Sequence, residues 1–209
     1  MTVPAARATN AIALLTCAVF LLSLLAGNGE ALDLMAGFVP ARFLGVQIPE
    51  ALPAWITPLT ATLLHGGWLH LAFNMLMLLF CGRMVEAVLG MPGFLLLYLT
   101  GAYAAAFGQY LIDPASLSPM IGASGAISAV FGAYALLFGK PRLLLGHPRA
   151  ALLVNIVWLA LAWVGVQFLM GLAFSGMGMA IAVGAHVGGF VAGLATAPLF
   201  MIYRRGQVG

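Results

Sequence analysis

Long apolar stretches with short polar breaks between them constrain this chain more than any other feature. Glycine, proline and charged residues divide the sequence into six such stretches. A helix needs about 20 mostly apolar residues to cross a bilayer, so stretches of this kind predict membrane-spanning helices. The predicted spans are residues 10–26, 67–83, 93–112, 122–139, 150–171 and 177–202.

The composition supports a polytopic membrane protein of the all-α class. Hydrophobic residues make up 64% of the 209 residues and charged residues only 6%, whereas a soluble domain carries about 25% charged residues. We expect one membrane domain over residues 1–209. The first apolar run, which no clear cleavage site follows, is interpreted as a spanning helix rather than a signal peptide. Basic residues do not cluster with aromatic ones, which argues against a nucleic-acid partner.

The placement of basic residues predicts the orientation. In a six-span arrangement, seven of the eight fall on one side, and that side is then cytoplasmic together with both termini. Residues 27–62 hold three acids, Arg42 and several prolines, and are predicted to form a long external loop. The seven residues on the cytoplasmic side are Arg7, Arg83, Lys140, Arg142, Arg149, Arg204 and Arg205.

Two of the predicted spans are too short to cross a bilayer on their own. From Ser124 to Gly139 there are about 15 residues, which reach only ~23 Å against a hydrocarbon core of ~30 Å. The span over 67–83 is similarly short. Backbone that is irregular at membrane depth must face protein or water. We therefore expect residues 114–121 to line a water-filled cavity above Ser124.

Four polar residues share the outer half of the predicted bundle. Ser124 opens the fourth span, and His186 lies inside the sixth. His70 and Asn74, spaced i, i+4, lie on one face of the second. An ionisable group at such a depth is a functional-site hypothesis by default.

These residue types match the needs of peptide-bond hydrolysis. A serine at a helix N-terminus lies beside free backbone N–H groups, which can stabilise an oxyanion. His186 can act as the general base for Ser124, and His70 with Asn74 can add side-chain donors. None of the five acids lies inside a span at this depth, so the sequence favours a Ser–His dyad over a triad.

Glycines accompany the polar residues on both helices. Gly122 and Gly125 flank Ser124 and permit tight turns. Gly189 and Gly193 follow His186 at i+3 and i+7, on one helix face, where they let a neighbouring helix approach closely.

Each feature also has a plainer interpretation. Ser124 can be a packing residue of a helix rich in glycine and alanine. His70 and Asn74 can form hydrogen bonds that hold neighbouring helices together. His186 can equally belong to a transporter, as a proton relay or substrate site. The remaining polar and aromatic residues are interpreted as structural: His65 as a loop or helix-start group, Glu86 with Arg83 as a local pair, and Trp68, Trp158 and Trp163 as interface or lipid-facing side chains.

Three motifs, in this order, resemble the rhomboid family of intramembrane serine proteases. They cover the six-span core from Ala11 to Tyr203. The first motif is His65-Gly-Gly-Trp-Leu-His70-Leu-Ala-Phe-Asn74, the second is Gly122-Ala123-Ser124-Gly125, and the third is Ala185-His186-Val-Gly-Gly189-Phe-Val-Ala-Gly193.

The resemblance implies a role for each matching residue. Ser124 is then the nucleophile and His186 the general base. The oxyanion hole combines His70 and Asn74 with the N–H groups of Ala123 and Ser124. Gly189 and Gly193 pack the sixth helix on the fourth. Substrates of the family are membrane-anchored proteins, cut in or near a spanning segment without metal or cofactor.

The external loop departs from the family pattern. Many members carry a Trp-Arg pair there, whereas Arg42 follows Ala41 in this chain and Trp55 precedes Ile56. The structure and lipid contacts of this loop are therefore open at this point. The compact size and the absence of an added soluble domain favour a place in the cytoplasmic membrane of a bacterium-like cell.

Overall fold

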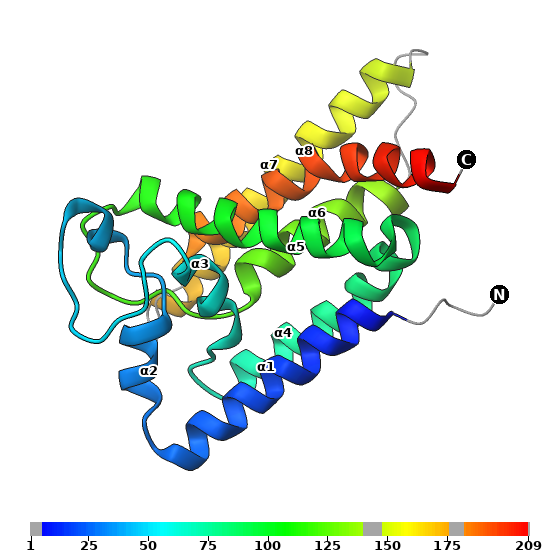
Figure 1. Ribbon diagram of the computed structural model, residues 1–209. Helices are drawn as coiled ribbons and strands as arrows, with labels where there is room; N and C mark the ends of the chain where they lie inside the picture. The colour runs from blue at the N-terminus through cyan, green and yellow to red at the C-terminus, as the bar shows by residue number, and fades with distance from the viewer. Residues whose placement is uncertain (1–5, 140–147, 176–181, 209) are drawn as a thin grey trace.

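The computed structural model describes residues 6–139, 148–175 and 182–208, and these form a bundle of helices (Figure 1). The long helices are α1 (Arg7–Ala26), α4 (Trp68–Met77), α5 (Arg83–Ile112), α6 (Ser124–Phe138), α7 (Pro148–Ser175) and α8 (Val183–Val208). The short ones are α2 (Gly29–Ala36), α3 (Thr57–Thr60), the 3₁₀ turns η1 (Pro40–Leu44) and η2 (Ala61–Leu63), and the π turn η3 (Leu78–Gly82).

The bundle contains helices that are suited to a bilayer. Within the described residues, three are long and apolar enough to cross one: Arg7–Ala26, Trp68–Ile112 and Val183–Ile202. Two shorter apolar helices cover Ser124–Phe138 and Ala150–Gly165. Helix is present in each of the six predicted segments, while the count of six membrane crossings stays a prediction. Residues 177–181 of the sixth predicted span, and Lys140 and Arg142, lie outside the described residues.

The prediction of a short second span is wrong. Helix α4 passes through η3 directly into α5 and stays helical beyond Arg83, up to a break at Gly90, where φ is 73°. Beyond this break α5 runs back along the bundle, opposite in direction to α4 (Figure 1). The fourth predicted span is short as expected, since α6 has 15 residues.

The buried carboxylate of Glu86 explains why the helix does not end at the charged residues Arg83 and Glu86. Its Oε1 accepts the Ala8 N–H at 3.0 Å, and its Oε2 accepts the Thr9 N–H at 2.8 Å and the Thr9 hydroxyl at 2.7 Å. The first N–H groups of a helix lack intrahelical partners, and the positive end of the dipole favours an anion. Glu86 thus ties α5 to the N-terminus of α1. The interpretation of Glu86 as a local partner of Arg83 is wrong, because Arg83 donates to Asn10 instead.

Replacing Glu86 with alanine is expected to lower the free energy of unfolding by about 2–4 kcal/mol, because three buried donors lose their acceptor. The midpoint of thermal unfolding of the purified protein measures this change. Arg83→Gln is the matched control, since its guanidinium makes one exposed bond of 3.3 Å. The control should shift the stability by less than about 0.5 kcal/mol. Equal midpoints for the two variants would contradict the role of Glu86.

The core lies where α5, α6 and α8 cross. Gly101 on α5 and Gly132 on α6 have no room for a side chain, since a Cβ on Gly101 would lie 2.5 Å from the Ala129 Cβ. Small residues therefore bring these backbones into contact, and fully buried larger side chains fill the rest of the core. These include Leu78, Val85, Leu89, Phe94, Leu97 and Val130.

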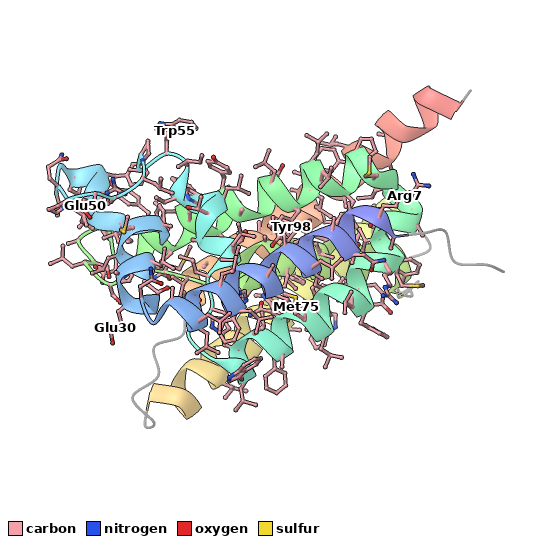
Figure 2. All side chains as sticks on the ribbon, turned by 60° about the horizontal axis from the view of Figure 1, so that its bottom comes forward. Arg7, Glu30, Glu50, Trp55, Met75 and Tyr98 are labelled. Carbon is pink, nitrogen blue, oxygen red and sulfur yellow. The ribbon has the colours of Figure 1, made fainter. Side chains whose placement is uncertain are left out.

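The two ends of the bundle carry opposite charge. The start of α1 and the end of α8 lie at the same end (Figure 1). Arg7 lies at the opposite end of the molecule from Glu30 and Glu50 (Figure 2). This arrangement agrees with both termini being on one side of the membrane, and the assignment of that side to the cytoplasm stays a prediction.

The segment over residues 27–62 is an ordered connection built from α2, η1 and α3. Arg42 stabilises it, because its Nη2 donates to the Leu52 carbonyl at 2.8 Å. The Leu52 N–H in turn donates to the Met35 carbonyl at 2.9 Å. Trp55 projects from the edge of this segment and is 66% exposed (Figure 2).

Candidate active site

Ser124 is the first residue of α6, and the turn before it depends on one glycine. Gly122 adopts φ +115°, a conformation that L side chains rarely take. A Cβ on Gly122 would also lie 2.6 Å from His70 Nε2 and 3.7 Å from Ser124 Oγ. Glycine is therefore required here both for the backbone conformation and for the close approach of the His70 ring.

His186 lies opposite this serine on α8. Its Nε2 is 2.8 Å from Ser124 Oγ, within hydrogen-bond distance, although the two residues are 62 positions apart in the sequence. Which atom carries the proton depends on the tautomer of the imidazole. This is the geometry that a serine nucleophile and its general base require.

The glycines of α8 make this approach possible. A Cβ on Gly189 would collide with the Gly125 carbonyl oxygen, and one on Gly193 would collide with the Ala129 carbonyl oxygen. On the other side of α6, a Cβ on Gly125 would lie 2.5 Å from the Ala105 Cβ. Since α8 contacts the α6 backbone directly, His186 is held one turn from the contact at Gly189.

The two polar residues of α4 differ in their surroundings. The His70 ring packs against the Gly122 turn, as the distance above shows. Asn74 is buried one turn further along the helix, and its Nδ2 donates to the His70 carbonyl at 2.8 Å. His70 is thus beside the serine, whereas one donor of Asn74 is occupied within its own helix.

His65 belongs to this cluster, although its sequence context suggested only a loop or helix-start group without a functional role. Its Nε2 lies 3.5 Å from the Ala123 N–H donor nitrogen, and its ring centroid is 4.9 Å from that of His70. In the sequence, His65 opens the first of the three motifs and lies five residues before His70. Gly66 and Gly67 lie between them, and the sequence alone does not tell how the chain turns there.

Trp163 connects α7 to the site, so its interpretation as an interface or lipid-facing side chain is wrong. Its Nε1–H donates to the His186 carbonyl at 3.2 Å. Its ring stacks on Phe190 at 5.1 Å between centroids and lies 4.8 Å from the ring of Phe131. Trp68 and Trp158 are exposed, as expected of interface or lipid-facing residues.

The connection 27–62 holds the segment that leads to the serine. Phe38 and Met120 form an antiparallel bridge with N–H···O distances of 3.0 and 2.8 Å. The Ala41 N–H donates to the Ser116 carbonyl at 3.1 Å, and the Gly122 N–H donates to the Ala61 carbonyl at 2.9 Å. Three backbone contacts therefore fix residues 116–122 against the external connection.

Within the described part of the chain, no group of three or more His, Cys, Asp and Glu side chains is arranged to hold a metal ion. The acids lie on other elements than Ser124 and His186. Glu86 is bound at α1, Glu30 and Asp33 lie on α2, and Asp113 caps the end of α5. The assignment of a dyad rather than a triad stays a prediction.

Comparison with known proteins places these motifs in one family. The family model described as Rhomboid domain matches residues 53–203. Rhomboid protease GluP of Bacillus subtilis is 40% identical over 78 residues, which is 37% of this chain and 15% of that protein. Rhomboid-like protein 11, chloroplastic, of Arabidopsis thaliana is 38% identical over 79 residues, 38% of this chain and 28% of that protein. The chain spans less than half the length of the curated relatives it matches.

Proposed function

The chain belongs to the rhomboid family, and from this premise we propose that it is an intramembrane serine endopeptidase. The observation that carries the proposal is the 2.8 Å separation of His186 Nε2 and Ser124 Oγ at the N-terminus of α6. Its substrates are membrane proteins, cut in or near a transmembrane segment. The whole chain acts as one membrane domain, without cofactor, in a bacterial cytoplasmic membrane.

Hydrolysis then proceeds in two steps. Ser124 Oγ attacks the scissile carbonyl carbon while His186 Nε2 accepts the hydroxyl proton, and His186 returns this proton to the leaving amine. A water molecule, deprotonated by His186, next attacks the acyl-serine ester. The ester C–O bond breaks, the new carboxyl end leaves, and Ser124 regains its proton.

The oxyanion of each tetrahedral intermediate needs preorganised donors. The Ser124 N–H, at the first position of α6, and the His70 side chain, beside Gly122, are available for this role. The Ala123 N–H and Asn74 are further proposed donors. In the described state the Ala123 N–H faces His65, and Asn74 Nδ2 donates to the His70 carbonyl.

A serine-directed probe tests the proposal directly. A fluorophosphonate or isocoumarin is expected to form one adduct with the detergent-purified protein, because His186 makes Ser124 nucleophilic. Mass spectrometry of peptides should locate the adduct on Ser124. A transporter that uses His186 as a polar site predicts no adduct, so an unlabelled Ser124 in folded protein would overturn the protease assignment.

A further inference from the structure

The structure gives His65 an environment that few histidines occupy. It lies between η2 and α4 and is only 8% exposed. Burial first, and the neighbouring His70 second, lower the pKa of its imidazole to about 4, with the Leu63 carbonyl partly opposing this shift. The ring is therefore neutral near pH 7, and one ring nitrogen is free to accept a hydrogen bond.

That acceptor faces the serine turn. His65 Nε2 receives the Ala123 N–H at 3.5 Å, a long hydrogen bond, while the preceding amide of Gly122 donates to Ala61 at 2.9 Å. Two successive amides before Ser124 are thus held by residues 61–65. The same imidazole lies 4.9 Å from the His70 ring, which itself packs on Gly122.

Burying this imidazole carries a cost. Nδ1 is buried without a hydrogen-bond partner of good geometry. A buried polar atom left in this way lowers the stability of the fold, and an apolar side chain would not have this effect. The other ring nitrogen, Nε2, contacts the Ala123 amide.

We propose that His65 is a positioning residue, whose Nε2 holds the Ala123 amide in the substrate-free site and thereby sets the orientation of the Ser124 N–H toward the oxyanion. The inference rests on the proposed function. His65 does not touch the substrate or the reacting atoms. It acts on the backbone of Gly122 and Ala123, and it packs against the ring of His70.

Two amide substitutions separate this role from simple packing. In His65→Gln the amide oxygen reaches as far as Nε2 does, so it can still accept the Ala123 N–H. In His65→Asn the side chain is one methylene shorter. Its amide group reaches only the position of Nδ1 and cannot accept the Ala123 N–H. Thr62→Val is the matched control, because Thr62 is also buried nearby, and its hydroxyl donates to the Leu59 carbonyl at 2.7 Å and lies beside Tyr98.

The measurements are kcat and KM for a transmembrane substrate, together with the rate constant for labelling of Ser124 by a fluorophosphonate. Rates are normalised to the sites labelled at completion, so misfolded protein does not contribute. For His65→Asn we expect kcat and the labelling rate to fall about 10- to 100-fold, with KM nearly unchanged. Small displacements of catalytic groups cause losses of this size. His65→Gln and Thr62→Val should stay within about threefold of the wild type on the same scale.

Three results would overturn the inference. One is a normal labelling rate for His65→Asn, and another is a loss in His65→Gln as large as that in His65→Asn. The third is an equal loss in Thr62→Val, which would show general damage to the loop. Failure of the proposed function looks different, since Ser124 of the wild type would then not be labelled at all.

Discussion

Replacing Ser124 with alanine is expected to abolish cleavage of a transmembrane substrate, with kcat falling by about four orders of magnitude or more. The variant lacks the oxygen atom that attacks the scissile carbonyl carbon in the proposed mechanism. His186→Ala should lose a comparable factor, because Ser124 Oγ then has no base at 2.8 Å to take its proton. Cleavage in proteoliposomes, followed by gel analysis of the products, measures both losses.

The double variant provides a stricter test of the pair. Residues that act as one unit are not additive, so Ser124→Ala/His186→Ala should be no slower than either single variant. Ser23→Ala is the control, since its hydroxyl bonds the Phe20 carbonyl within α1 and should leave cleavage unchanged. Cleavage at the wild-type rate by folded Ser124→Ala protein would refute the assignment of the nucleophile.

Enlarging Gly193 is expected to have the largest effect on stability. Even the Cβ of an alanine there would collide with the Ala129 carbonyl oxygen of α6, which is backbone and cannot rotate away. Overpacking of this kind costs typically 1–3 kcal/mol, and a valine adds two more carbons in the same place. We therefore expect Gly193→Ala to lower the thermal unfolding midpoint by several degrees and Gly193→Val to prevent assembly of α8 against α6.

Among the Gly193 variants, cleavage activity should fall together with the thermal unfolding midpoint. Gly193 lies two turns from His186 on the same face, so separating the helices also separates His186 from Ser124. Gly165→Ala is the matched control, because a Cβ at Gly165 on α7 meets nothing within 4 Å. It should leave the midpoint unchanged or raise it, since alanine favours helix by about 1 kcal/mol over glycine. An unchanged midpoint for Gly193→Val would show that α8 does not depend on this contact.

Some elements follow from the sequence because their cause is local. Helix α1 ends at Ala26, where the predicted first span ends, since Gly27 adopts the left-handed conformation there. Helix α6 begins at Ser124 and ends at Phe138, one residue before the predicted end. In both cases apolar length, glycine and charge act within a few residues of the boundary.

Other features depend on partners that are distant in the sequence. The charges at Arg83 and Glu86 suggested the end of a span, but the N-terminus of α1 satisfies Glu86 and the helix continues. The sequence suggested a lipid-facing Trp163, but in the fold its Nε1–H donates a hydrogen bond to the His186 carbonyl on α8. His65 opens the first motif, but the sequence does not show that its partner is Ala123, 58 residues away.

The sequence by itself determined that this chain forms apolar helices, and it placed Ser124, His186, His70 and Asn74 on three of them. Hydrophobic length and helix signals are local properties, which is why they can be read without a structure. Only the tertiary structure decided which polar atoms meet. Contacts at Gly189 and Gly193 allow the backbone of α8 to approach the backbone of α6 closely, and that approach sets the distance between His186 and Ser124.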